Sequence, residues 1–149
     1  MKIWVDADAL PGQIKEIITK AAHNRCIKTI FVSNKAIYVP TSPYLSCIQV
    51  EQGPDVADAY IEERAEDKDL VITQDIPLAA LLVPKGTVVI SFHGDLFTPS
   101  NIRERLSIRN FMHELRGNGI ETSGPKAWSD KNKQQFANTF DQQLVKLLT

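Results

Sequence analysis

Cysteine is scarce in this sequence of 149 residues, and the two that occur, Cys26 and Cys47, limit the kinds of site it can build. Two thiols supply neither a disulfide framework nor a four-cysteine zinc site. Long apolar runs are also lacking, since stretches such as 78–83 fall far short of the roughly 20 residues that span a bilayer. The early acid Asp6 leaves no room for the apolar segment of a signal peptide. We therefore expect a soluble, cytoplasmic protein with no membrane segment.

An excess of charge of one sign is missing as well. The net charge is −1, which excludes a uniformly basic nucleic-acid-binding protein but not a local basic patch. Residues 1–95 carry nine Lys and Arg against thirteen Asp and Glu, a net charge of −4, whereas residues 96–149 carry eight against five, a net charge of +3. Hydrophobic residues make up 43% and charged residues 23%, as in globular proteins. An acidic part is therefore followed by a mildly basic one.

Repeats and flexible Gly/Ser linkers are absent, and the length predicts a single domain over residues 1–149. Short apolar runs alternate with segments of helical spacing, which predicts an α/β fold with a mainly parallel central sheet and helices on both faces. The predicted core covers residues 1–95, and a helical extension over 96–149 packs on it. We expect strands at 2–5, 27–32, 70–73 and 87–92, shorter strands at 36–39 and 48–50, and helices at 11–24, 53–65, 76–83, 98–116 and 129–148.

Aspartates stand where the predicted strands end. Asp6 and Asp8 follow the first strand, Asp75 follows a later one, and Asp55 and Asp58 lie one turn apart on a helix. Because the carboxyl ends of parallel strands meet at one edge of a sheet, we expect these acids to gather there. Clustered carboxylates repel one another without a cation, and oxygen-only ligands suit Mg²⁺ or Mn²⁺. Such ions activate water and stabilise the leaving oxygen of a phosphodiester.

Most of these acids also have a purely structural interpretation. Asp8 and Asp75 are placed like helix N-caps, and Asp55 is placed to interact with a helix dipole. Asp58 is typical of a solvated surface acid. Asp95, in the turn after the last strand, is either an additional metal ligand or a turn residue.

Candidate substrate-binding residues lie outside the acidic group. Ser33 and Asn34 end the second strand and could contact a phosphate, although turn residues have the same pattern. A group of arginines could grip a polyanion bidentately, or could simply form a solvated helix face. These are Arg103, Arg105, Arg109 and Arg116. His93, after the last strand, is typical of a structural histidine.

Several motifs together resemble the YaiI/YqxD family of uncharacterised bacterial proteins. They are the segments 5–11, 55–58, 69–79 and 101–106, together with Arg109, the Gly124-Pro125 loop, Asp130 and Phe136. That family is similar to the PIN domain, a fold of metal-dependent nucleases, and the resemblance implies a site of Asp6, Asp58 and Asp75 with Asp8 as an additional acid. The family commonly has cysteine where this chain has Leu10, so the resemblance implies no role for a thiol here.

We therefore predict a divalent-metal-dependent ribonuclease or related phosphodiesterase in which Asp6, Asp8, Asp58 and Asp75 hold Mg²⁺ or Mn²⁺. Asp55 and Asp95 are additional candidate ligands, and single-stranded RNA is the candidate partner. One alternative is a phosphatase resembling the haloacid dehalogenases, with Asp6 as nucleophile and Asp8 as general acid. Another is a non-catalytic module that binds RNA or protein on a PIN-like scaffold. A carboxylate cluster that repels phosphate gives a pure RNA-binding module no advantage.

Overall fold

The computed structural model describes residues 1–53, 55–121 and 128–149, so Pro54 and the Gly124-Pro125 motif lie outside the described residues. The helices and strands follow one another in the order β1 (Ile3–Asp6), α1 (Gly12–Arg25), β2 (Thr29–Ser33), β3 (Leu45–Gln49), α2 (Val56–Arg64), β4 (Leu70–Ile72), α3 (Ile76–Leu82), the 3₁₀ turn η1 (Val83–Lys85), β5 (Val88–Ile90), β6 (Leu96–Phe97), α4 (Ile102–Gly117) and α5 (Asp130–Leu148).

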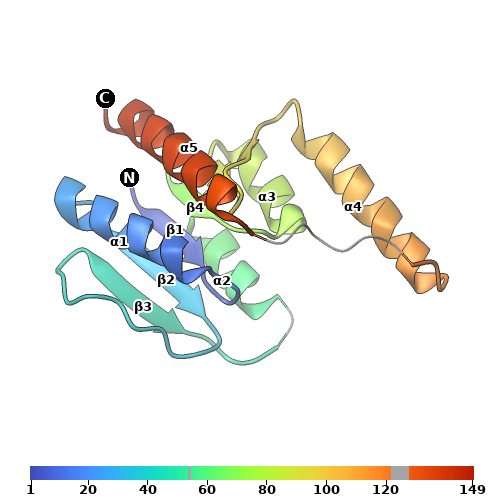
Figure 1. The fold of residues 1–149 in the computed structure, drawn as a ribbon, viewed down its shortest axis with the longest axis horizontal. Coiled ribbons are helices and arrows are strands. Elements are labelled where there is room, and N and C mark those ends of the chain that lie inside the picture. Colours follow the sequence, from blue (N-terminus) through green and yellow to red (C-terminus); the bar gives the residue numbers. More distant parts are fainter. Residues whose placement is uncertain (54, 122–127) are drawn as a thin grey trace.

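The strands form one sheet in the order β3-β2-β1-β4-β5-β6, in which only the last pair, β5 and β6, is antiparallel. Helices cover both faces of this sheet (Figure 1). The predicted α/β fold, with a mainly parallel sheet and C-terminal helices, is confirmed and is consistent with a PIN-like arrangement. The chain winds from β1 outward to β3 and then returns to place β4 on the other side of β1. Ligands bind at such a reversal in open α/β sheets, beyond the carboxyl ends of the strands.

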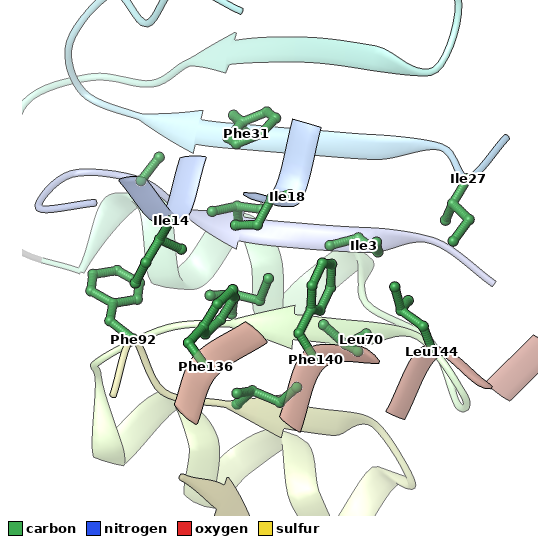
Figure 2. Packing of buried hydrophobic residues seen from close by; sticks show 14 residues of the cluster. Ile3, Ile14, Ile18, Ile27, Phe31, Leu70, Phe92, Phe136, Phe140 and Leu144 are labelled. Atoms are coloured by element: carbon green, nitrogen blue, oxygen red, sulfur yellow. The ribbon is translucent and has the colours of Figure 1, made fainter. Parts of the chain in front are cut away.

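Successive side chains of each strand point to opposite faces of the sheet and so pack into two separate apolar layers. On one face, Ile3 and Val5 of β1 pack with α1 and with α5. Figure 2 shows Phe136, Phe140 and Leu144 of α5 pointing at the sheet. On the other face, Trp4 packs with α2 and α3. Because side chains alternate along a strand, Asp6 has the same orientation as Trp4 and is directed toward the α2 side.

The start of α5 lies close against the turn that follows β5. The indole Nε1 of Trp128 donates to the Phe92 carbonyl at 3.0 Å, and Thr139 Oγ1 donates to the Gly94 carbonyl at 2.8 Å. Gly94 has φ +88°, and a Cβ there would lie 2.6 Å from the carbonyl carbon of Gln135. Glycine therefore permits both the turn and the close approach of the helix.

A buried acid fastens β1 to the loop before β4. The carboxylate of Asp69 accepts hydrogen bonds from the Lys2 backbone at 2.9 Å, the Trp4 indole at 3.1 Å and the Glu66 backbone at 2.9 Å. Asp69 is only 3% exposed. With three donors satisfied by one carboxylate, its role is structural.

Several segments differ from the sequence prediction. The strand expected at 48–50 is β3 at Leu45–Gln49, and β6 was not predicted. Residues 36–39 form no strand; Ile37 and Val39 pack against the core without pairing to a neighbouring strand, so their alternation reflects packing alone. The helix expected from 98 begins at Ile102, because the Asn101 side chain binds the Thr98 backbone N–H at 2.8 Å and closes a turn.

The α4 helix packs on α3 through its first turn and exposes most of its remaining length. Ile102 is its one buried residue, while Ile108 and Phe111 are 50% and 58% exposed. Figure 1 shows α4 extending away from the remaining elements. None of the helices in the described ranges combines the length and apolar character that crossing a membrane requires.

Candidate functional site

A cavity of about 270 Å³ opens beyond the carboxyl ends of β1 and β4, where the strand order reverses. Five of the predicted acids line it, namely Asp6, Asp8, Asp55, Asp58 and Asp75. They come from β1, the loop after it, the start of α2 and the start of α3. The fold thus brings together acids that lie up to 69 positions apart in the sequence.

Thr73 joins the acids of the two central strands. Its fully buried hydroxyl donates to Asp6 Oδ2 at 2.8 Å and accepts from the backbone N–H of Asp75 at 3.0 Å. This bridge fixes the Asp6 carboxylate at the end of β1 and sets the direction in which the chain leaves β4. Asp6 and Asp75 are therefore held near each other by a specific side chain.

The α2 helix brings Asp58 to the same place. Its buried residues Ala57 and Ile61 pack on the sheet, and this docking carries Asp58 to the sheet edge. Asp55 precedes the helix with φ +63°, a left-handed conformation that aspartate tolerates better than most residues. One carboxylate oxygen from each of Asp55, Asp58 and Asp75 lies within 4.8 Å of the other two.

The crowding changes the acidity of two of these groups. Burial, a hydrogen bond with Asp75, and the negative charges of Asp75, Asp6 and Asp55 together raise the pKa of Asp58 to about 8. Burial also raises the pKa of Asp6, assisted by the charges of Asp8 and Asp75 and opposed by the hydrogen bonds from Thr73 and Asp58. Ionising the whole cluster is therefore unfavourable without a cation.

The donor set fits a hard divalent cation. Apart from the Gln74 amide, every polar side chain that lines the cavity among the described residues is a carboxylate, the donor that Mg²⁺ and Mn²⁺ prefer, and none is a thiol or an imidazole. Asp55, Asp58 and Asp75 are the residues positioned to hold such an ion, and Asp6 lies beside them.

Asp8 is anchored differently from the other acids. Its Oδ1 accepts from Ser33 Oγ at 2.8 Å and from the backbone N–H of Asn34 at 2.8 Å, which ties it to the end of β2. It does not cap α1, whose N-cap is Pro11. Ser33 and Asn34, predicted to bind substrate, thus position Asp8 and do not line the cavity.

Asp75 combines the structural and the functional interpretation. Its Oδ1 accepts from the backbone N–H of Leu78 at 2.8 Å, so it is the N-cap of α3. The same carboxylate contributes to the acidic cluster. Asp55, at the corresponding position of α2, makes no side-chain cap hydrogen bond.

The remaining predicted residues lie elsewhere. Asp95 belongs to the turn after β5, where its backbone N–H binds Ser91 Oγ at 3.0 Å and its carboxylate lies 3.7 Å from Arg105. It is not among the residues that line the cavity. The predicted arginines all lie on α4 and do not line the cavity either; they are Arg103, Arg105, Arg109 and Arg116.

Sequence reasoning did not single out Gln74, Phe92 and Thr73. Gln74 and Phe92 line the cavity, and Thr73 supports Asp6 from beneath it. The signal for Thr73 and Gln74 was present, since both come directly after the buried run 70–72, as Asp75 does. Phe92 carried no such signal, because an apolar residue after a strand is typical of the core.

Comparison with known proteins gives one consistent result. The sequence model of a family described as "Uncharacterized BCR, YaiI/YqxD family" matches residues 4–146. A UPF0178 protein of Myxococcus xanthus (strain DK1622) is 51% identical over 148 residues, which are 99% of this chain and 97% of that protein. A UPF0178 protein of Syntrophobacter fumaroxidans (strain DSM 10017 / MPOB) is 52% identical over 146 residues, 98% of this chain and 95% of that protein. No solved structure matches the chain significantly.

Proposed function

The chain belongs to the YaiI/YqxD family, and from that premise we propose that it is a divalent-metal-dependent phosphodiester hydrolase acting on single-stranded RNA. The observation that carries the proposal is the convergence of Asp6, Asp58 and Asp75 on one cavity at the reversal of the sheet. The N-cap made by Asp75 and the hydrogen bond from Thr73 to Asp6 do not require three carboxylates to lie together. The cluster is costly to ionise, and a bound Mg²⁺ or Mn²⁺ would offset that cost.

Each acid has its own role in this proposal. Asp55, Asp58 and Asp75 would hold the ion, and Asp6, fixed by Thr73, would orient the reacting group beside it. When bound, the ion supplies an activated water and neutralises charge that develops on the phosphate. With a pKa of about 8, Asp58 is mostly protonated at neutral pH in the metal-free protein, and it would have to lose this proton to hold a cation.

RNA is favoured as the substrate by the charge of the C-terminal part. The α4 helix carries four arginines, and Arg103 and Arg109 are exposed on it. The exposed ring of Phe111 lies on the same helix. Arginine side chains and exposed aromatic rings are both groups with which proteins bind a single strand.

The experiment measures Mn²⁺ binding by calorimetry and cleavage of a 5′-labelled single-stranded RNA. We expect Asp6→Asn and Asp75→Asn each to lower kcat/KM roughly 100-fold or more, because each removes a charged oxygen from the ion or from its neighbour. The matched control is Asp141→Asn, the same substitution at an exposed acid on α5. Cleavage at the wild-type rate by both cavity variants would refute the assignment.

A second readout separates the phosphatase alternative. Beryllium fluoride mimics a phosphorylated aspartate, so its stable attachment to Asp6, in a protein that leaves RNA intact, would favour nucleophilic catalysis by that residue. We expect no such adduct, because Asp6 Oδ2 accepts a hydrogen bond from the Thr73 hydroxyl, which makes that oxygen a weaker nucleophile.

A further inference from the structure

Gln74 contributes a hydrogen-bond donor to a cavity that otherwise presents carboxylates. Of the side chains that line the cavity in the described part of the chain, five are aspartates and Gln74 is the one donor that persists when those aspartates are ionised. Gln74 immediately precedes Asp75, and its side chain is exposed. An exposed glutamine on a loop is ordinarily free to adopt many rotamers, but this one is held.

Two hydrogen bonds fix the orientation of the Gln74 carboxamide. Its Oε1 accepts the backbone N–H of Phe92 at 2.7 Å, and its Nε2 lies 3.1 Å from His93 Nδ1. The reverse orientation would set the amide nitrogen against the Phe92 N–H, with two donors facing each other. The oxygen is therefore committed to Phe92, and the nitrogen donates to His93.

This arrangement also assigns the tautomer of His93. Its Nδ1 accepts from Gln74 and carries no proton, so the ring proton of the neutral imidazole resides on Nε2. That Nε2 is buried and has no hydrogen-bond partner among the described residues. A buried donor left unpaired lowers stability, so His93 is not explained by stability alone. The hydrogen bond from Gln74 to His93 Nδ1 indicates that the role of His93 is to orient the Gln74 side chain.

The turn that carries these partners is held by Thr139 of α5 and by Trp128, just before that helix. Trp128 binds the Phe92 carbonyl, Thr139 binds the Gly94 carbonyl, and the His93 backbone N–H donates to Ser91 Oγ at 3.2 Å. The C-terminal helix thereby sets the position of the turn that orients Gln74. One of the two Gln74 Nε2 protons is used by His93, and no hydrogen bond joins the other to a described residue.

We propose that the second N–H of Gln74 donates to a non-bridging phosphate oxygen of the RNA, and that His93 is a positioning residue for it. This inference rests on the proposed hydrolase function. It identifies Gln74 as the side chain that binds the anionic substrate in a cavity whose carboxylates repel it. A neutral amide suits that task because it binds a phosphate oxygen without competing with the cation for the carboxylates, as a lysine would.

The test compares Gln74→Met with Gln142→Met, the same substitution at an exposed position of α5. The probe is a 12-nucleotide fluorescein-labelled single-stranded RNA, bound in Ca²⁺ to suppress cleavage and cleaved in Mn²⁺. We expect Gln74→Met to weaken RNA affinity or lower kcat/KM about 10- to 100-fold, the effect of losing one hydrogen bond to a charged group. Mn²⁺ affinity should stay within about 2-fold of wild type, because Gln74 is not a ligand. RNA affinity and kcat/KM both equal to wild type in Gln74→Met would overturn the inference.

The role of His93 is tested by His93→Phe, alone and combined with Gln74→Met. If His93 acts through Gln74, His93→Phe lowers kcat/KM in the wild-type background and has no further effect in the Gln74→Met background. Equal losses in both backgrounds would show an independent role and reject the positioning assignment. Thermal melting of each variant verifies that the fold is retained.

The two proposals fail in different ways. A protein that binds RNA through Gln74 in Ca²⁺ but never cleaves it would refute the hydrolase and retain the phosphate donor. A protein that cleaves RNA equally well with Met at position 74 would refute the donor and retain the hydrolase. RNA that does not bind even the wild-type chain would overturn both.

Discussion

Asp58 is the side chain of the cavity whose protonation the fold changes most. Its pKa of about 8 in the folded chain exceeds the ordinary 3.8, so the folded state binds this proton more tightly than the unfolded state does. The associated stability is fully present below about pH 3.8 and is lost as the pH rises toward 8. Above pH 8 the cavity therefore contains a charge that destabilises the metal-free fold.

Asp58→Asn should consequently raise the melting temperature of the metal-free protein more at pH 9 than at pH 5. We expect a difference of about 3–6 °C at pH 9, allowing for partial solvent screening, and a much smaller one at pH 5. Calorimetric melts in EDTA at both pH values measure it, with Asp67→Asn, the same substitution at an exposed acid in the loop before β4, as control. An equal shift at both pH values would contradict the assigned cause.

Asp75 can be separated into its two roles by the choice of substitution. Asparagine caps helices as well as aspartate does, so Asp75→Asn should keep the stability of α3 at or above the wild-type level. Asp75→Ala removes the cap and should lower the free energy of unfolding by about 1 kcal/mol relative to Asp75→Asn. Both variants should lose Mn²⁺ affinity alike. Urea unfolding and calorimetric titration measure the two effects, and retained Mn²⁺ affinity in either variant would exclude Asp75 as a ligand.

The sequence predicted some of these side chains better than others. Asp6 and Asp75 could be found because each comes soon after an apolar run, and the residues just beyond parallel strands gather at one edge of the sheet. Gln74 follows the same apolar run as Asp75, but the orientation of its side chain could not be predicted, because it depends on a turn 18 positions later. Asp69, like Asp75, is an aspartate close to the apolar run 70–72, so the sequence does not tell a structural acid from a cavity acid. The three donors that bind Asp69, among them the Trp4 indole, can be identified only once β1 and the loop before β4 are placed side by side.

The docking of α5 on the turn after β5 depends on a glycine. Gly94→Ala would place a Cβ 2.6 Å from the backbone of Gln135 and would strain a residue at φ +88°. We expect a loss of about 2–4 kcal/mol in the free energy of unfolding. Gly117→Ala is the control, since a Cβ at that helical position meets no atom within 4 Å. It should be neutral or stabilise the protein by up to about 1 kcal/mol. Equal stabilities of the two variants would contradict the close approach.

Helices and strands differed in how well their limits could be predicted. The strongly apolar runs 70–73 and 87–92 produced β4 and β5 within one or two residues at each end. The strand β6 could not be predicted, because two residues are too few to show the alternation of apolar and polar side chains that indicates a strand. Residues 36–39 have a strand-like alternation but no strand beside them to pair with. Pairing is a property of two segments, so a single segment cannot reveal it.

Charge is divided between the acidic cavity and the basic α4 helix. If α4 contacts RNA, the double variant Arg103→Ala/Arg109→Ala should weaken RNA binding. It should also reduce the slope of log affinity against log salt concentration by about 1.4, because each lost phosphate contact to a single strand accounts for about 0.7. Fluorescence anisotropy between 50 and 200 mM salt, the usual range for such measurements, provides the slope. The control Lys133→Ala/Lys146→Ala removes two exposed charges from α5. An unchanged slope in the α4 variant would exclude this helix from the RNA contact.

The position of β1 in the middle of the sheet has a consequence for biosynthesis. Residues 3–6 are synthesised before both of their partner strands. They pair with β2 once residues 29–33 have been made, but their other edge has no partner until residues 70–72 have been made. During that interval an apolar strand offers unpaired backbone groups to any other nascent chain. Dense polysomes therefore favour mispairing, and slowing translation before codon 70 should increase aggregation of the newly made protein.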